Sequence, residues 1–220
     1  MSRRPTMWQA VLATQWKWTR PLALLGVLVT FAIPILSLRL AEATESISAF
    51  VAAMQSWGVA YAVAAAGLGL ITAIAAWGYD HRLRHVYALS LPVARWRYVA
   101  MRFGAGLVML APPIVALFAS CEIVAHSSGI PPALHAYPVA LTLRFSFASI
   151  VAYALFFAIS SATGRTAGYI LGAIAFVIVA QIMLSSANIT IDMLSRAADV
   201  VFAAPGLLAV FAGRWTLIDV

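Results

Sequence analysis

The residues of this chain that could do chemistry are concentrated in one polar stretch, Tyr79–Arg102. Five arginines and two histidines lie there against a single acid, Asp80, and a long hydrophobic segment stands on each side. Short loops rich in lysine and arginine stay on the cytoplasmic side of a membrane, because positive charge resists translocation. The stretch is therefore predicted to be a cytoplasmic loop, and it fixes the orientation of every other segment.

The sequence lacks the usual patterns of an enzyme or of a metal-binding protein. It contains no G-x-x-x-x-G-K-[ST] phosphate loop, no H-E-x-x-H pair, no cysteine cluster and no G-x-S-x-G turn around a serine. The glycines at 67, 69, 104 and 106 lie within hydrophobic segments, where glycine permits close helix packing. We therefore predict a chain that is not catalytic by itself and that binds no metal or cofactor.

The composition is that of a membrane protein. Of 220 residues, 64% are hydrophobic and 10% are charged, whereas a soluble domain carries about 25% charged residues. The predicted fold class is an all-α, polytopic integral membrane protein, with residues 1–220 forming a single transmembrane domain. The net charge of +7 comes from basic residues beside hydrophobic segments, so we expect them to contact anionic lipids and not nucleic acid. The single cysteine, Cys121, excludes an internal disulfide.

The hydrophobic segments predict five firm transmembrane helices and a short sixth piece. Five apolar runs approach or exceed the roughly 18 residues that a membrane helix needs, namely 21–40, 56–78, 98–125, 139–161 and 167–185. Residues 186–220 are expected to form an outer segment followed by the apolar run 200–213. That run is short and contains a Pro-Gly pair, so a sixth span and a re-entrant or interfacial piece both remain open.

Two further features of these runs predict local structure. Trp57 and Trp77 stand twenty residues apart, which is about 30 Å along a helix, and predict an aromatic residue at each membrane boundary. Pro112 and Pro113 remove backbone donors from the third run and predict a bend or a break there.

The N-terminal residues 5–19 predict an amphipathic helix on the cytoplasmic membrane face. Trp8, Val11, Leu12, Trp16 and Thr19 share one face at helical spacing. The alternative is a cytosolic extension of the first span. The basic start and apolar run are also compatible with a signal peptide, but the long, tryptophan-rich leader and Arg39 favour an uncleaved anchor.

The middle of the polar loop predicts a short amphipathic helix. Leu83, Val86 and Tyr87 follow helical spacing, and Leu91-Pro92 ends the run. Such a helix between two spans has the shape that docks into a groove on a cytosolic partner. An ordinary basic loop lying against lipid headgroups is the alternative, and periodicity alone does not decide between them.

The end of the loop resembles a known family. The run Leu89-Ser90-Leu91-Pro92-Val93-Ala94-Arg95-Trp96-Arg97-Tyr98-Val99 follows Asp80 and precedes Arg102-Phe103 and Gly106. This order resembles the loop between the second and third helices of ATP-binding-cassette (ABC) transporter permeases of the type-2 exporter class. There an acid starts the loop, an L-x-S-L-P-V-S-R-like phrase closes it, and a basic residue and a glycine open the next helix. The N-terminal segment is similar to that family's elbow helix.

The chain also departs from the family pattern at two places. The Gly-Thr often found inside the family's loop is replaced by Leu83 and Arg84, and the long sixth helix with a basic tail is missing or shortened.

The resemblance implies a permease subunit that pairs with a second permease subunit, of the same chain or a homologue, and with two cytosolic ABC ATPase subunits that bind ATP and Mg. Residues 79–98 would form the coupling helix, through Asp80, Arg82, Leu83, Arg84, Val86, Tyr87, Leu91, Pro92 and Arg95. The location implied is the inner or plasma membrane, with the N-terminus in the cytoplasm. The resemblance implies export, and the small residues and few charges within the spans favour a hydrophobic or amphipathic substrate. The alternative function is a non-transporting assembly or anchor subunit that recruits a cytosolic partner through the same loop.

Three polar residues stand within the spans at similar depth from the predicted outer ends: Glu122, Arg144 and Gln181. Ionisable residues in a bilayer are costly and normally face a partner or a cavity. We predict that Glu122 and Arg144 pair. The pair would act as a bridge between helices or as part of an outer gate or substrate path.

Overall fold

The structure is a computed structural model that describes residues 7–82, 94–127, 129–161 and 208–219, with isolated positions (169, 176, 196, 199, 200, 203 and 206) between the last two ranges. The side chains of residues 18 and 78–82 are not described. Contacts divide the chain into two units, one of Met1–Phe157 with Arg214–Val220 and one of Ala158–Gly213.

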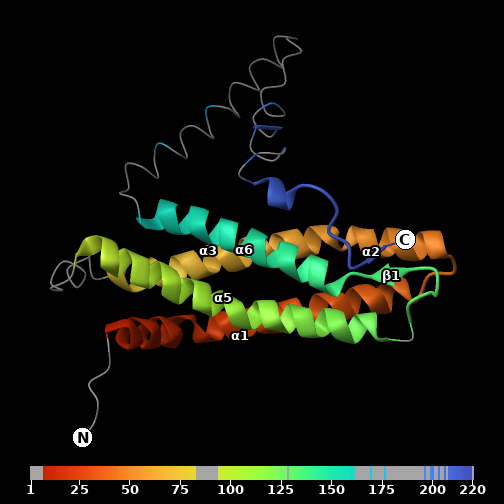
Figure 1. Ribbon diagram of the computed structural model, residues 1–220, viewed down its shortest axis with the longest axis horizontal. Coiled ribbons are helices and arrows are strands. Elements are labelled where there is room, and N and C mark those ends of the chain that lie inside the picture. Colours follow the sequence, from red (N-terminus) through yellow and green to blue (C-terminus); the bar gives the residue numbers. More distant parts are fainter. Residues whose placement is uncertain are drawn as a thin grey trace, which may run out of the picture. The chain divides into compact units, whose positions relative to one another are not determined.

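Long helices dominate the described residues (Figure 1). In chain order the elements are α1 (Met7–Ala41), α2 (Ile47–Ser56), α3 (Gly58–Arg82), α5 (Arg95–Ala125), β1 (His135–Ala136), α6 (Pro138–Ser161), the 3-10 turn η1 (Ala209–Phe211) and β2 (Ile218–Asp219). Four stretches are long and apolar enough to cross a membrane: Thr19–Ala41, Ile47–Trp77, Arg95–Ala125 and Pro138–Ser161. They indicate a multi-pass membrane protein and match the first four predicted spans.

The structure describes only part of the predicted fifth span and of the last apolar run. The fifth, 167–185, lies outside the described residues except at positions 169 and 176, and Gln181 lies outside them as well. At the end of the last apolar run, residues 208–213 form a turn, η1 and two bends. These six residues therefore do not continue an α-helical span.

The N-terminal segment is part of α1. The helix is continuous from Met7 to Ala41, so the described part of 5–19 is not a separate element but extends the first span. The side chains of this segment differ in burial. Gln15 and Thr19 are buried, whereas Trp8 and Trp16 remain 38% and 42% exposed.

A short helix, α2, forms the first part of the second candidate span, ahead of the predicted start at residue 56. Ser46 caps α2, because its hydroxyl oxygen accepts a hydrogen bond from the Ala49 amide at 3.2 Å. The helix ends at Ser56, and α3 begins after a single turn residue, Trp57. The predicted aromatic belt is wrong at its other end, because the Trp77 side chain is 5% exposed and packs inside the bundle.

Polar side chains join α1 to α5. The Thr30 hydroxyl lies 2.9 Å from the Pro113 carbonyl and 2.8 Å from the Gly26 carbonyl of its own helix, and Ser120 donates to the Phe31 carbonyl at 2.6 Å. Such bonds hold helices together where water is absent. The helix α5 is unbroken through Pro112 and Pro113, so the predicted break does not occur.

Glycines set the close approach of α3 to α6. A Cβ on Gly69 would lie 2.6 Å from the Tyr153 backbone nitrogen and 2.6 Å from the Ala152 Cβ. The neighbouring Gly67 has no atom within 4 Å of the same position. The two glycines are therefore a matched pair, one enclosed by another helix and the other open.

We expect Gly69→Ala to lower the free energy of unfolding by about 1–3 kcal/mol, the usual cost of overpacking, because the opposing atom is backbone and cannot turn aside. The control Gly67→Ala should be neutral or stabilising by up to about 1 kcal/mol through helix propensity. Thermal unfolding of the purified protein in detergent measures both. Equal effects of the two substitutions would contradict this packing.

We also expect Gln15→Met to stabilise the protein. Gln15 is 1% exposed, and neither its amide nitrogen nor its oxygen has a hydrogen-bond partner among the described residues. An unpaired buried polar group costs about 1–3 kcal/mol, and methionine has a similar volume without that cost. The same unfolding measurement checks the gain, and a clear loss of stability would show that the amide is used.

Candidate functional site at the base of the arginine-rich loop

The loop that the sequence singles out connects α3 to α5, and most of it lies outside the described residues. Asp80 and Arg82 belong to the last turn of α3, but their side chains are not described. Leu83, Arg84, Val86, Tyr87, Leu91 and Pro92 lie outside the described residues. Arg95 is the first residue of α5 and is exposed. The structure therefore describes the base of the loop and not the predicted coupling helix itself.

Arg102 is the central residue of this base. Its side chain is almost fully enclosed, with 3% of the residue exposed. One guanidinium nitrogen, Nη1, donates to the Ala76 carbonyl in α3 at 2.9 Å. Nε and Nη2 donate to the Tyr98 hydroxyl at 3.0 and 2.7 Å. Arg102 thus joins the last turns of α3 to the first turns of α5.

A tyrosine from α6 completes the junction. The Tyr153 hydroxyl lies 3.1 Å from the Phe103 carbonyl and 3.4 Å from the Arg102 carbonyl, so its proton is directed at the backbone of α5. The ring passes directly over Gly106, where any Cβ would overlap the Tyr153 hydroxyl. The absence of a side chain at 106 is therefore what allows α6 to reach α5 here.

Aromatic rings surround this polar contact. Phe157 of α6 packs against Trp77 of α3 with ring centroids 5.2 Å apart, and against Phe103 of α5 at 5.3 Å. Phe103 also stacks on Tyr153 at 5.1 Å. Rings at these separations add to the burial energy of the cluster, so the guanidinium is held among three helices by a packed aromatic shell.

The depth of Arg102 explains why so many bonds are needed. It stands seven residues into α5, about 10 Å from the start of the helix. This position lies inside the candidate span Arg95–Ala125. A charged side chain inside a bilayer costs roughly 2.5–3.5 kcal/mol at the helix centre and needs hydrogen-bond partners. The sequence offered one signal for this role, because Arg102 follows Tyr98 by one helical turn inside a hydrophobic run.

The polar residues predicted to pair at the other end of the spans have different partners. Glu122 lies 3.7 Å from Nδ1 of His126, one turn further along α5. Arg144 of α6 donates to the Arg214 carbonyl at 2.5 Å, and its guanidinium lies 4.9 Å from the centre of the Trp215 ring. No ion pair between Glu122 and Arg144 is present in the part of the chain that the structure describes. The sequence analysis did not predict that the C-terminal segment contacts Arg144 through the Arg214 carbonyl and the Trp215 ring.

That C-terminal segment closes the end of the bundle opposite the loop (Figure 1). The strands β1 and β2 pair antiparallel, with Ala136 opposite Ile218, and the Tyr137 amide donates to the Leu217 carbonyl at 2.8 Å. Trp215, Leu217 and Ile218 are buried. A Cβ on Gly58 would lie 3.1 Å from the Trp215 carbonyl, so the segment also packs on the start of α3.

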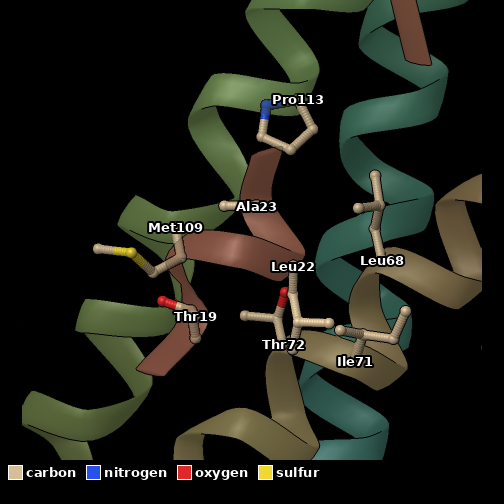
Figure 2. A pocket seen from close by; sticks show the side chains of 8 residues that line it. All are labelled: Thr19, Leu22, Ala23, Leu68, Ile71, Thr72, Met109 and Pro113. Atoms are coloured by element: carbon tan, nitrogen blue, oxygen red, sulfur yellow. The ribbon is translucent and has the colours of Figure 1, made fainter. Parts of the chain in front are cut away.

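An apolar crevice opens between α1, α3 and α5 (Figure 2). Leu22 and Ala23 line it from α1, Leu68 and Ile71 from α3, and Met109 and Pro113 from α5, with the hydroxyl-bearing residues Thr19 and Thr72. It offers apolar contacts and no ionisable group. Among the described residues no group of three His, Cys, Asp or Glu side chains could hold a metal ion.

In comparisons with known proteins, no family model, no curated protein and no solved structure matches this chain.

The fold predicts that Arg97 and Arg214 lie on opposite sides of the membrane. Both are exposed, Arg97 in the first turn of α5 and Arg214 beside β2. In intact cells, a membrane-impermeant maleimide should modify R214C, and should modify R97C only after permeabilisation. The native Cys121 is buried and gives a low background. Labelling of both variants from one side would contradict the fold, and the reverse pattern would place the arginine-rich loop outside.

Proposed function

We propose that this chain is the membrane permease subunit of an ATP-driven transporter of the ABC type-2 exporter class. The observation that carries the proposal is the phrase Leu89–Val99 in a basic loop between two membrane helices. The described helices support it, because α3 and α5 are both long enough to span a membrane and bracket this loop directly. Residues 79–98 are then the surface that meets a cytosolic ATPase.

In this proposal, the chain conveys movement and does not catalyse. ATP and Mg bind to separate ATPase subunits, whose closure favours one arrangement of the docked loop and so of the helices attached to it. A second permease subunit, identical or homologous, completes the transmembrane path. The cargo is hydrophobic or amphipathic, in keeping with the few charges within the described spans. The complex resides in the inner or plasma membrane with the N-terminus in the cytoplasm.

The direct test is to purify the tagged chain from its native membrane and to look for an associated ATPase with a Walker motif. The charge-reversed variant R82E/R84E should lower recovery of that ATPase by about tenfold or more, which is roughly 1.4 kcal/mol of binding free energy. Opposite charge at the loop would repel the surface that the arginines are expected to meet.

The matched control is Arg39→Glu, which also reverses an exposed arginine but near the opposite end of the bundle, where Arg39 pairs with Glu42 at 3.1 Å. It should leave ATPase recovery unchanged, because an exposed ion pair contributes little. Recovery of an ATPase whose hydrolysis the chain does not stimulate would favour the anchor subunit. Isolation of the intact complex without any ATPase would overturn the proposal.

A further inference from the structure

Arg102 is placed unlike an arginine that only fixes topology. An arginine serving the positive-inside rule can face headgroups and water, as the exposed Arg95 and Arg97 do. Arg102 is instead 3% exposed and directs its guanidinium across to another helix. Enclosing a charge is costly, and replacing it by an apolar side chain of similar size is often neutral or stabilising. Stability alone therefore does not account for an arginine at this position.

The bonds of Arg102 link the three helices at the loop end. Its side chain holds the Ala76 carbonyl of α3, and its own carbonyl and that of Phe103 face the Tyr153 hydroxyl of α6. The end of α3 and the start of α5, which flank the loop, are thus bonded to each other. The helix α5 is also bonded to α6, which is not attached to the loop. A displacement imposed on either end must move α6 or break these bonds.

We propose that Arg102 is a positioning residue that ties α3 to α5, whose backbone Tyr153 of α6 bonds, so that movement of the loop's two ends reaches the far end of α6. The inference rests on the proposed coupling function, because it requires a motor acting on the loop. Tyr98 holds the guanidinium in place, and Tyr153 carries the movement onward. Gly106 provides the space in which Tyr153 reaches α5.

The experiment uses the full chain in lipid nanodiscs with the ATPase that co-purifies with it. Spin labels at Ile47 and Val139, which are 51% and 55% exposed at the starts of α2 and α6, report on the end opposite the loop. Their distance distribution is measured by pulsed electron paramagnetic resonance, without nucleotide and with Mg-ATP and orthovanadate. The wild-type chain should show a nucleotide-dependent shift.

The decisive variant is R102M/Y98F, which removes the guanidinium together with the hydroxyl it binds, so that neither partner is left alone. It should fold, bind the ATPase as the wild type does, and lose the shift. Arg97→Met makes the same change at an exposed position on α5 and should keep the shift. Arg102→Lys, which keeps the charge and one bond, should restore part of it.

Tyr153→Phe provides an independent route if R102M/Y98F does not fold, since it removes only the hydroxyl directed at α5. It should also lose the shift while the ATPase remains bound. A full shift in Tyr153→Phe, or in folded R102M/Y98F, would overturn the role of Arg102 and leave the proposed function standing. Absence of a shift in the wild type, or of any bound ATPase, would overturn both.

Discussion

The close approach of α3, α5 and α6 is the constraint on which the rest of this structure depends. It is made possible by two glycines. At Gly69, backbone atoms of α6 fill the space that a side chain would need, and at Gly106 the Tyr153 ring fills it. Only at that separation can the Tyr153 hydroxyl face α5 carbonyls and the Arg102 guanidinium reach α3. A methyl group at either glycine would separate the helices and place these polar groups in hydrocarbon without partners, where they are most costly.

Several polar groups in the described spans follow the same requirement. Threonine and serine hydroxyls bond to carbonyls of their own or neighbouring helices, as Thr30 and Ser120 do between α1 and α5. Gln15 is one of several exceptions, because its amide, the Trp77 Nε1 and the Thr142 and Ser149 hydroxyls are buried and have no hydrogen-bond partner among the described residues. The presence of Gln15 in α1 is not explained by packing.

The sequence predicted the features that depend on composition and length. Apolar runs located the first four spans, and the charge of the intervening loop distinguished it from the others, because both signals are local. It could not predict the orientation of individual side chains. Trp77 looked like a boundary residue but lies inside the cluster, and Glu122 and Arg144 do not meet because Arg214 and Trp215 return from the distant C-terminus to occupy Arg144. Such contacts depend on which segments fold back, and no spacing in the sequence records that.

The two ends of α3 and α6 are held by different means, and this difference bears on how they can move. At one end, the C-terminal segment packs on Gly58 of α3 and accepts a hydrogen bond from Arg144 of α6. Midway along the two helices, Gly69 of α3 lies against Ala152 of α6. At the loop end, the two helices meet through Trp77 and Phe157, and both are bonded to α5 around Arg102. Helices joined at three levels cannot slide past one another without breaking packed contacts, and packed contacts change between discrete arrangements. The contacts between α3 and α6 are therefore spread over three levels, and at the loop end they are joined by bonds to α5.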